Sequence, residues 1–273
     1  MCATCGCGDE GATITAPGHT HPHDNGQTHH EHHHHDDDHH HDEAPPHTET
    51  ITLEQKVLAK NDELAERNRA WLAARDILAL NLTSSPGAGK TTLLERTIRD
   101  LASARPVSVI EGDQETLLDA ERITAAGARA VQVNTGAGCH LDAEMVHRAL
   151  HELDPERGSV LFIENVGNLV CPALFDLGEH SKVVIISVTE GDDKPMKYPH
   201  MFAAAGLVII NKIDLLPYVS FDLEKCCGYV RSLNRDAQIL AMSAATGDGS
   251  SRWYEWIDDC ANSASVLAPV DKT

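Results

Sequence analysis

The sequence predicts an α/β fold, with a mostly parallel sheet and helices on both faces, preceded by a disordered tail rich in cysteine and histidine. From residue 52 onward, short β-branched apolar runs alternate with helix-like segments, as in a sheet buried on both faces. A glycine-rich turn of the kind that binds phosphate in P-loop nucleoside triphosphatases follows the first run. Residues 1–50 contain ten Asp or Glu, no Lys or Arg, and 13 of the chain's 18 histidines. We therefore expect a tail, 1–50, and one domain, 52–273.

The tail has too few apolar residues to offset the cost of ordering its backbone. Its histidines, interrupted by acids, offer many weak sites for Ni, Zn or Cu, although an inert solubilising tail also fits the composition. Cys2, Cys5 and Cys7 precede the histidines. No secretory signal is evident, so we expect a cytoplasmic protein with reduced thiols, which favours a metal over a disulfide. Which metal the three cysteines bind stays open at this point.

Charge and hydropathy exclude two classes of partner. The formal net charge is −20, whereas a nucleic-acid-binding surface needs clustered Lys and Arg. No apolar run reaches the roughly 18 residues of a membrane-spanning helix. We therefore expect neither a nucleic acid nor a membrane as partner.

The domain elements follow in order. Apolar residues at helical spacing predict a helix from Thr52 to about Arg75, the run 77–82 predicts a buried strand, and a helix follows from Lys90. Six more strands are expected at "VSVIE", "AVQV", "SVLFIE", "KVVIISV", "GLVIIN" and "QILAM". The segment 252–259 predicts an amphipathic C-terminal helix whose Trp253 and Trp256 are core residues.

The stretch "SSPGAGKTT" (84–92) predicts a phosphate loop. Small residues allow backbone N–H groups to surround phosphate oxygens at a helix N-terminus, a Lys reaches the β- and γ-phosphates, and a hydroxyl binds Mg²⁺. The strict motif has Gly where Ser84 stands. The candidate residues are Ser85, Gly87, Ala88, Gly89, Lys90, Thr91 and Thr92.

The base is read by a second motif, N-K-x-D, formed by Asn211, Lys212 and Asp214 at a strand end. A carboxylate can accept both the N1–H and the exocyclic amine of guanine, and adenine offers no such pair. Ser243 and Ala244, after the next strand, fit the loop that supports the base. Together the motifs predict GTP rather than ATP as ligand.

Two acids between these motifs are candidate Mg²⁺ and switch residues. Asp113 lies just beyond the second strand, and Glu164 ends a later strand and is followed by Gly167. A surface acid at a strand end would produce the same pattern. No side chain stands out as a catalytic base, so we expect slow intrinsic hydrolysis driven by positioning and electrostatics.

A further constellation contains Cys139, His140 and Cys171, all in loops expected at the nucleotide end of the sheet. Thiolate and imidazole ligands suit Zn²⁺ or Ni²⁺. Buried packing thiols are the alternative. A metal at this position would sense the γ-phosphate through the loop that follows Glu164.

Taken in order, these motifs resemble the HypB family, the nickel-inserting GTPases of [NiFe]-hydrogenase maturation. The matching stretches, which span nearly the whole chain, are "CATCGCG", the His-rich insert, "SSPGAGKTTLLE", "EGDQET", "GAGCHLD", "ENVGNLVCP" and "NKIDLLPY".

The resemblance implies a GTPase whose nucleotide-dependent homodimerisation gates delivery of Ni²⁺. It implies a nickel site at Cys2, Cys5 and Cys7, and a Ni²⁺ or Zn²⁺ site at Cys139, His140 and Cys171. It also implies Mg²⁺ and switch contacts by Thr91, Asp113 and Glu164, and as partners the companion factor HypA and the hydrogenase large subunit. Three thiolates with a terminal amine could form the square plane that Ni(II) favours.

Related families fit the sequence less well. The urease-maturation GTPase shares a His-rich N-terminus, but its Cys-Pro-His metal motif does not occur here. Dimeric ATPases with a deviant phosphate loop have a signature Lys where Ser85 stands and lack N-K-x-D. A non-enzymatic nickel store and a GTP-gated zinc chaperone stay open. We expect His147 and His151 to be solvated surface residues rather than a metal clamp. Three cysteines are expected to be packing thiols: Cys226, Cys227 and Cys260.

Overall fold

The computed structural model describes residues 13–15, 47–113, 118–136 and 138–267. Cys2, Cys5, Cys7 and the histidine tract lie outside these residues, so the predicted N-terminal metal site stays a prediction. Within the described ranges no helix is both long and apolar enough to cross a membrane.

The described strands form one sheet in the order β1-β4-β3-β5-β2-β6-β7-β8. All neighbouring strands are parallel except the antiparallel edge pair of β1 and β4. The strands are β1 Thr13–Thr15, β2 Leu78–Ser84, β3 Val107–Asp113, β4 Arg129–Asn134, β5 Val160–Glu164, β6 Ser181–Ser187, β7 Leu207–Asn211 and β8 Gln238–Ala241. The seven predicted strands are thus confirmed, and β2 lies in the middle of the sheet.

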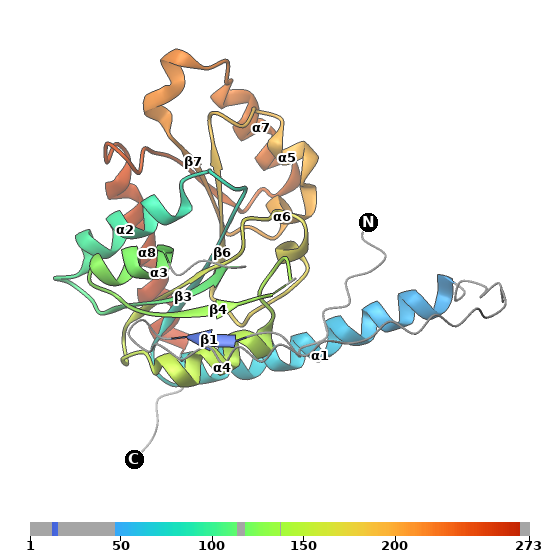
Figure 1. Cartoon of the computed structure of the whole chain (residues 1–273). Coiled ribbons are helices and arrows are strands. Elements are labelled where there is room, and N and C mark those ends of the chain that lie inside the picture. Colours follow the sequence, from blue (N-terminus) through green and yellow to red (C-terminus); the bar gives the residue numbers. More distant parts are fainter. Residues whose placement is uncertain (1–12, 16–46, 114–117, 137, 268–273) are drawn as a thin grey trace, which may run out of the picture.

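Helices cover both faces of this sheet (Figure 1). They are α1 His47–Ala73, α2 Lys90–Leu101, α3 Leu118–Ala125, α4 Ala143–Leu153, α5 Lys194–Lys197, α6 Pro199–Ala203, α7 Leu223–Leu233 and α8 Ser250–Leu267. Two 3₁₀ helices, η1 Cys171–Ala173 and η2 Ile213–Tyr218, follow β5 and β7.

Side-chain alternation along each strand explains why the runs are apolar throughout. In β2, Leu78, Leu80 and Leu82 pack on one face with α2, α3 and α8, whereas Ala79 packs on the other with α1 and α4. A third cluster joins β6 and β7 to α6 and α7. Trp253 is fully buried and stacks on Trp256, with ring centroids 5.6 Å apart, so both are core residues as predicted.

Three boundaries differ from the prediction. β1 and the first turn of α1, which begins at His47, both fall within the segment 1–50 that was predicted to be disordered. An edge strand of three residues needs only backbone partners, here those of β4, so the sparse apolar residues did not reveal it. Asp113 is the last residue of β3 rather than the residue beyond it, because pairing with β4 continues to Asn134.

Candidate nucleotide and metal site

The carboxyl ends of β2, β3 and β5 open into a pocket of about 400 Å³. This is the crevice in which parallel α/β sheets bind ligands. The lining residues are Ser84, Ser85, Pro86, Gly87, Ala88, Gly89, Lys90, Thr91, Thr92, Glu111, Gly112, Arg122, Glu164, Gly167 and Lys212. All seven predicted phosphate-loop residues therefore surround one cavity.

The loop conformation explains its glycines. Gly87 and Gly89 have φ angles of 76° and 94°, in the left-handed region that favours glycine. A Cβ on Gly89 would also lie 2.5 Å from Nδ2 of Asn211. Ser84, by contrast, is the last residue of β2 and has no positive φ, so this position tolerates a side chain. Helix α2 begins at Lys90 and directs its first N–H groups toward the pocket.

Lys90, Thr91 and Glu164 form a polar cluster at the base of the pocket. Nζ of Lys90 donates to the backbone carbonyl of Asn165 and lies 3.2 Å from Oε1 of Glu164. The Thr91 hydroxyl donates to the same Oε1 over 2.9 Å. The second oxygen of Glu164 is buried and has no hydrogen-bond partner in the described structure. A buried carboxylate oxygen beside a threonine hydroxyl suits a hard cation such as Mg²⁺.

Glu111 is a pocket acid that the sequence did not single out. It is buried, lines the pocket from β3 and is the register partner of Glu164 on β5. Asp113, the predicted Mg²⁺ contact on the same strand, has a side chain outside the described structure, so its role stays a prediction. An acid that ends an otherwise apolar run, as in "VSVIE", is the signal that could have identified Glu111.

The predicted base-recognition loops are joined to the phosphate loop. Asn211 is buried; its Nδ2 donates to the carbonyl of Ala88 over 2.9 Å, and its Oδ1 accepts from the N–H of Ala244 over 2.9 Å. Lys212 donates to the carbonyl of Gly87 over 2.7 Å. One asparagine therefore ties the phosphate loop to the Ser-Ala loop.

Three further hydrogen bonds shape the predicted base-recognition loop. Arg96 of α2 donates to the carbonyls of Ala244 and Ala245 over 2.6 and 2.8 Å, and Ser243 accepts from the N–H of Thr246 over 3.1 Å. Oδ1 of Asp214 is buried and has no hydrogen-bond partner among the described residues. An unpaired buried carboxylate oxygen in the predicted base-recognition motif is what a donor-bearing base such as guanine would satisfy.

Cys139, His140 and Cys171 come together as predicted. Their ligand atoms all lie within 4.8 Å of one another, with the two Sγ atoms 2.9 Å apart and Sγ of Cys139 3.6 Å from Nδ1 of His140. His140 is buried against the ring of Phe175, with centroids 4.0 Å apart. Burial lowers the pKa of His140 from 6.5 to about 4. The imidazole is therefore neutral at physiological pH, the form that binds metals.

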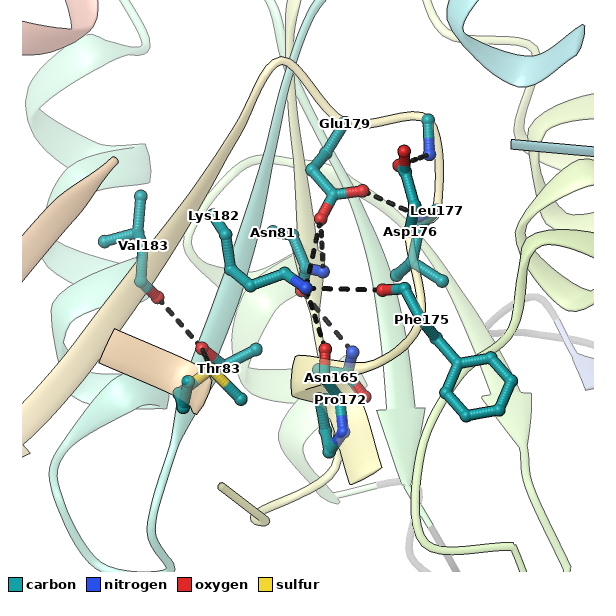
Figure 2. Close-up of polar contacts among 12 residues, drawn as sticks. Asn81, Thr83, Asn165, Pro172, Phe175, Asp176, Leu177, Glu179, Lys182 and Val183 are labelled. Carbon is teal, nitrogen blue, oxygen red and sulfur yellow. Dashed lines mark hydrogen bonds and ion pairs between the residues drawn. The ribbon is translucent and has the colours of Figure 1, made fainter. Parts of the chain in front are cut away.

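A buried polar cluster lies beside the segment that bears Cys171 (Figure 2). Lys182 donates to the carbonyls of Pro172 and Phe175 over 2.8 and 3.3 Å, and its Nζ lies 3.8 Å from Oε1 of Glu179. The same oxygen of Glu179 accepts from Nδ2 of Asn81 over 3.0 Å. This cluster anchors the 3₁₀ helix that begins at Cys171, and the sequence did not reveal it.

Of the remaining histidines and cysteines considered above, His151 is exposed as predicted, and the others pack against neighbouring elements. His147 contacts Oδ1 of Asn68 on α1 over 3.0 Å and the ring of His151, with centroids 4.6 Å apart. His147 is therefore packed against α1 rather than simply solvated. Cys226 is fully buried, and burial raises the pKa of its thiol to about 12. Cys227 and Cys260 pack against the core, in agreement with the prediction of packing thiols.

Comparison with known proteins gives one consistent result. The family model described as "CobW/HypB/UreG, nucleotide-binding domain" matches residues 78–241. The chain is 48% identical over 286 residues to "Hydrogenase maturation factor HypB" of Escherichia coli K12, covering 94% of this chain and 98% of that protein. Its fold is similar to a structure of HypB from Archaeoglobus fulgidus, with a TM-score of 0.70 and 40% identity over 75% of this chain and 100% of that chain. HypB from Helicobacter pylori, solved "in complex with nickel", has a TM-score of 0.72 and 35% identity over 78% of this chain and 100% of that chain.

Proposed function

Because this chain belongs to the HypB family of hydrogenase maturation factors, whose members are nickel-binding GTPases, we propose that it hydrolyses GTP and delivers Ni²⁺ to the [NiFe]-hydrogenase large subunit. In this proposal GTP binding closes a cytoplasmic homodimer, and hydrolysis releases the ion to the client. The observation that carries the proposal is the direct contact between the nucleotide pocket and the segments that bear the cluster of Cys139, His140 and Cys171. Glu164 lines the nucleotide pocket, and the next residue is Asn165. Asn165 contacts both Lys90 and Leu141, the residue after His140.

The nucleotide would be held by residues already described. Backbone N–H groups from Gly87 to Thr92 surround the phosphates, Lys90 binds the β- and γ-phosphates, and Asp214 accepts from guanine. Mg²⁺, held by Thr91 and Glu164, would neutralise charge that develops on the phosphates. Lys90 now donates to Glu164 and Asn165, and phosphate oxygens would compete for the same ammonium.

The cargo ion would occupy two kinds of site. Cys139, His140 and Cys171 supply three ligands, and a site with three protein ligands keeps a coordination position open for exchange. We propose this as the transit site for Ni²⁺, with Zn²⁺ as the competing ion. Cys2, Cys5 and Cys7 would form the tighter nickel site, and the histidine tract would store the ion.

Protein contacts are proposed at the face that carries Cys171. Val170 and Leu174 flank η1 with exposed fractions of 58% and 55%, so two apolar side chains are open to solvent beside Cys171. Partner contact at this face would bring the ion directly to the exchange surface. The proposed partners are a second copy of this chain in the GTP state, the companion factor HypA and the hydrogenase large subunit.

A lysine substitution tests the two-site proposal. Lys90→Ala should abolish GTP turnover, because it removes the cation that stabilises the transferred phosphoryl group, and should leave nickel binding at the N-terminal cysteines intact. Turnover is measured by phosphate release, and nickel binding by the thiolate-to-metal absorption band. Lys60→Ala is the matched control, since Lys60 is exposed on α1. Wild-type turnover in Lys90→Ala, or a collapse of its N-terminal nickel affinity, would contradict the proposal.

A nickel store is the second candidate, and the histidine content favours it. Deleting residues 16–46, which contain most of the histidines and leave β1 and α1 intact, distinguishes the two functions. A delivery GTPase without this segment should still support hydrogenase maturation when nickel is plentiful, whereas a store would lose its purpose.

A further inference from the structure

Asn165, the residue after Glu164, lies between the nucleotide pocket and the metal ligands. It is buried, with an exposed fraction of 1%. Its backbone carbonyl accepts from Nζ of Lys90. Its side-chain Oδ1 accepts from the N–H of Leu141 over 3.1 Å and from that of Val166 over 3.0 Å. Since Leu141 directly follows His140, one residue contacts both the phosphate-binding lysine and the segment that carries two metal ligands.

The amide nitrogen of Asn165 contacts Asn81, in the buried polar cluster that also includes Lys182 and Glu179 (Figure 2). Nδ2 donates to Oδ1 of Asn81 over 3.4 Å, and Asn81 donates to Glu179. Lys182, close to Glu179, holds the carbonyl of Pro172, the residue after Cys171. The asparagine amide is therefore in contact, directly or through buried side chains, with both segments that supply the metal ligands.

Nucleotide binding would offer Lys90 new hydrogen-bond acceptors. An ammonium has three N–H donors, and charged phosphate oxygens are stronger acceptors than an amide carbonyl. Because Nζ of Lys90 already contacts the carbonyl of Asn165 and Oε1 of Glu164, several phosphate oxygens in the pocket would compete with that carbonyl for the ammonium. Because Asn165 is close-packed, a change at its carbonyl is transmitted to Oδ1 and to the N–H of Leu141.

We infer that Asn165 is a positioning residue that couples nucleotide binding to metal affinity at Cys139, His140 and Cys171. This coupling rests on the proposed GTP-gated delivery of a metal ion. In this role Asn165 touches neither the ion nor the nucleotide base. It acts by linking the segment after β5 to the segment after β4.

Asn168 provides a matched control. Its Nδ2 donates to the carbonyl of Cys139 over 3.2 Å, so it also contacts the metal-binding segment. None of its described hydrogen bonds reaches the phosphate loop, and its Oδ1 accepts from Val170 over 2.8 Å. Substitution of Asn168 should change metal affinity in every nucleotide state by a similar factor, whereas substitution of Asn165 should change the dependence on nucleotide.

The experiment uses linkage, because a metal that senses nucleotide must change nucleotide affinity by the same factor. The affinity of the full-length protein for a fluorescent, non-hydrolysable GTP analogue with Mg²⁺ is measured without and with saturating Ni²⁺. The ratio of the two affinities is the coupling factor. A Cys139→Ser chain shows how much of that factor comes from nickel bound elsewhere, including the N-terminal tail. The four chains compared are wild type, Cys139→Ser, Asn165→Ala and Asn168→Ala.

We expect a wild-type factor of about fivefold or more, which is the low end of typical coupling between sites. Asn165→Ala should reduce the factor to below about twofold, toward that of Cys139→Ser, and Asn168→Ala should keep it. An Asn165→Ala chain that keeps the wild-type factor overturns the inference and leaves the proposed function intact. A wild-type factor equal to that of Cys139→Ser contradicts the GTP-gated metal site itself.

A second measurement needs no substitution, in case Asn165→Ala does not fold. Amide hydrogen exchange at Leu141 reports the bond to Oδ1 of Asn165 in the wild-type protein. Adding the GTP analogue should change this exchange rate by at least about threefold while amides in the buried strand β7 stay unchanged. A Leu141 rate that does not respond to nucleotide would overturn the inference.

Discussion

Guanine selectivity should depend on Asp214, and an isosteric substitution tests this directly. A carboxylate accepts from both the N1–H and the exocyclic amine of guanine, and Oδ1 of Asp214 is buried with no hydrogen-bond partner among the described residues. Asp214→Asn keeps one acceptor but places an N–H₂ donor against the donor amine of the base. The substitution therefore removes one hydrogen bond and the negative charge that strengthens the other.

The expected loss follows from these two bonds. A hydrogen bond to a charged group contributes about 1.5–3 kcal/mol, and a neutral one about 0.5–1.5 kcal/mol. Losing one charged bond and weakening the second should cost about 2–4 kcal/mol, or roughly 30- to 900-fold in GDP affinity. Xanthine has a carbonyl where guanine has the amine. The asparagine N–H₂ can donate to that carbonyl, so affinity for xanthosine diphosphate should rise.

The assay is a fluorescence titration with a labelled GDP, followed by competition with unlabelled GDP, xanthosine diphosphate and ADP. Asp236→Asn is the matched control, because Asp236 is exposed in the turn before β8. GDP affinity within about threefold of wild type in Asp214→Asn would refute the assignment of the base site, as would a loss of affinity shared equally by GDP and xanthosine diphosphate.

Three further substitutions test the supporting structure. Asn211→Ala leaves two buried loop groups unpaired and should reduce the free energy of unfolding by about 2–4 kcal/mol in urea titrations. Lys182→Met leaves the buried carboxyl of Glu179 without its cation and should cost about 3–5 kcal/mol, with recovery in the double variant Lys182→Met/Glu179→Leu. His140 resists protonation in the native state but not when unfolded. The free energy of unfolding of the metal-free protein should therefore fall by up to about 3 kcal/mol as pH falls from 6.5 to about 4. Urea titrations at each pH measure this loss, and the part due to His140 should be absent from His140→Gln.

Patterns that are local in sequence predicted the fold and the outline of the site. Seven β-branched runs predicted seven parallel strands because burial on both faces demands apolar residues at every position. The phosphate loop, Glu164 and Asn211 could be located because parallel strands bring their carboxyl ends to one edge. Cys139 and Cys171, 32 residues apart in the sequence, lie close together because both follow strands at this same edge.

Contacts that depend on side-chain direction could not be predicted in this way. Asn165 resembles any polar residue after a strand, and its importance comes from a buried amide that reaches Leu141. Lys182 is the second residue of the apolar strand β6, and nothing in its neighbours indicates that its ammonium donates to the carbonyl of Pro172. Glu111 and Asp113 lie on the same strand two residues apart, so sequence alone could not show that Glu111 lines the pocket.

The strand order suits a coupling between the nucleotide pocket and the proposed metal ligands. Cys139 and His140 follow β4, and Cys171 follows β5, yet β3 lies between these strands in the sheet. The ligands are therefore held on two separate segments rather than on one rigid element. Metal–ligand bonds of about 2.0–2.3 Å tolerate changes of only about 0.2 Å. A displacement of the segment after Glu164 relative to the segment after Asn134 would thus alter metal affinity at the proposed site. Asn165, which is buried and contacts both Lys90 and Leu141, would transmit such a displacement from the nucleotide pocket.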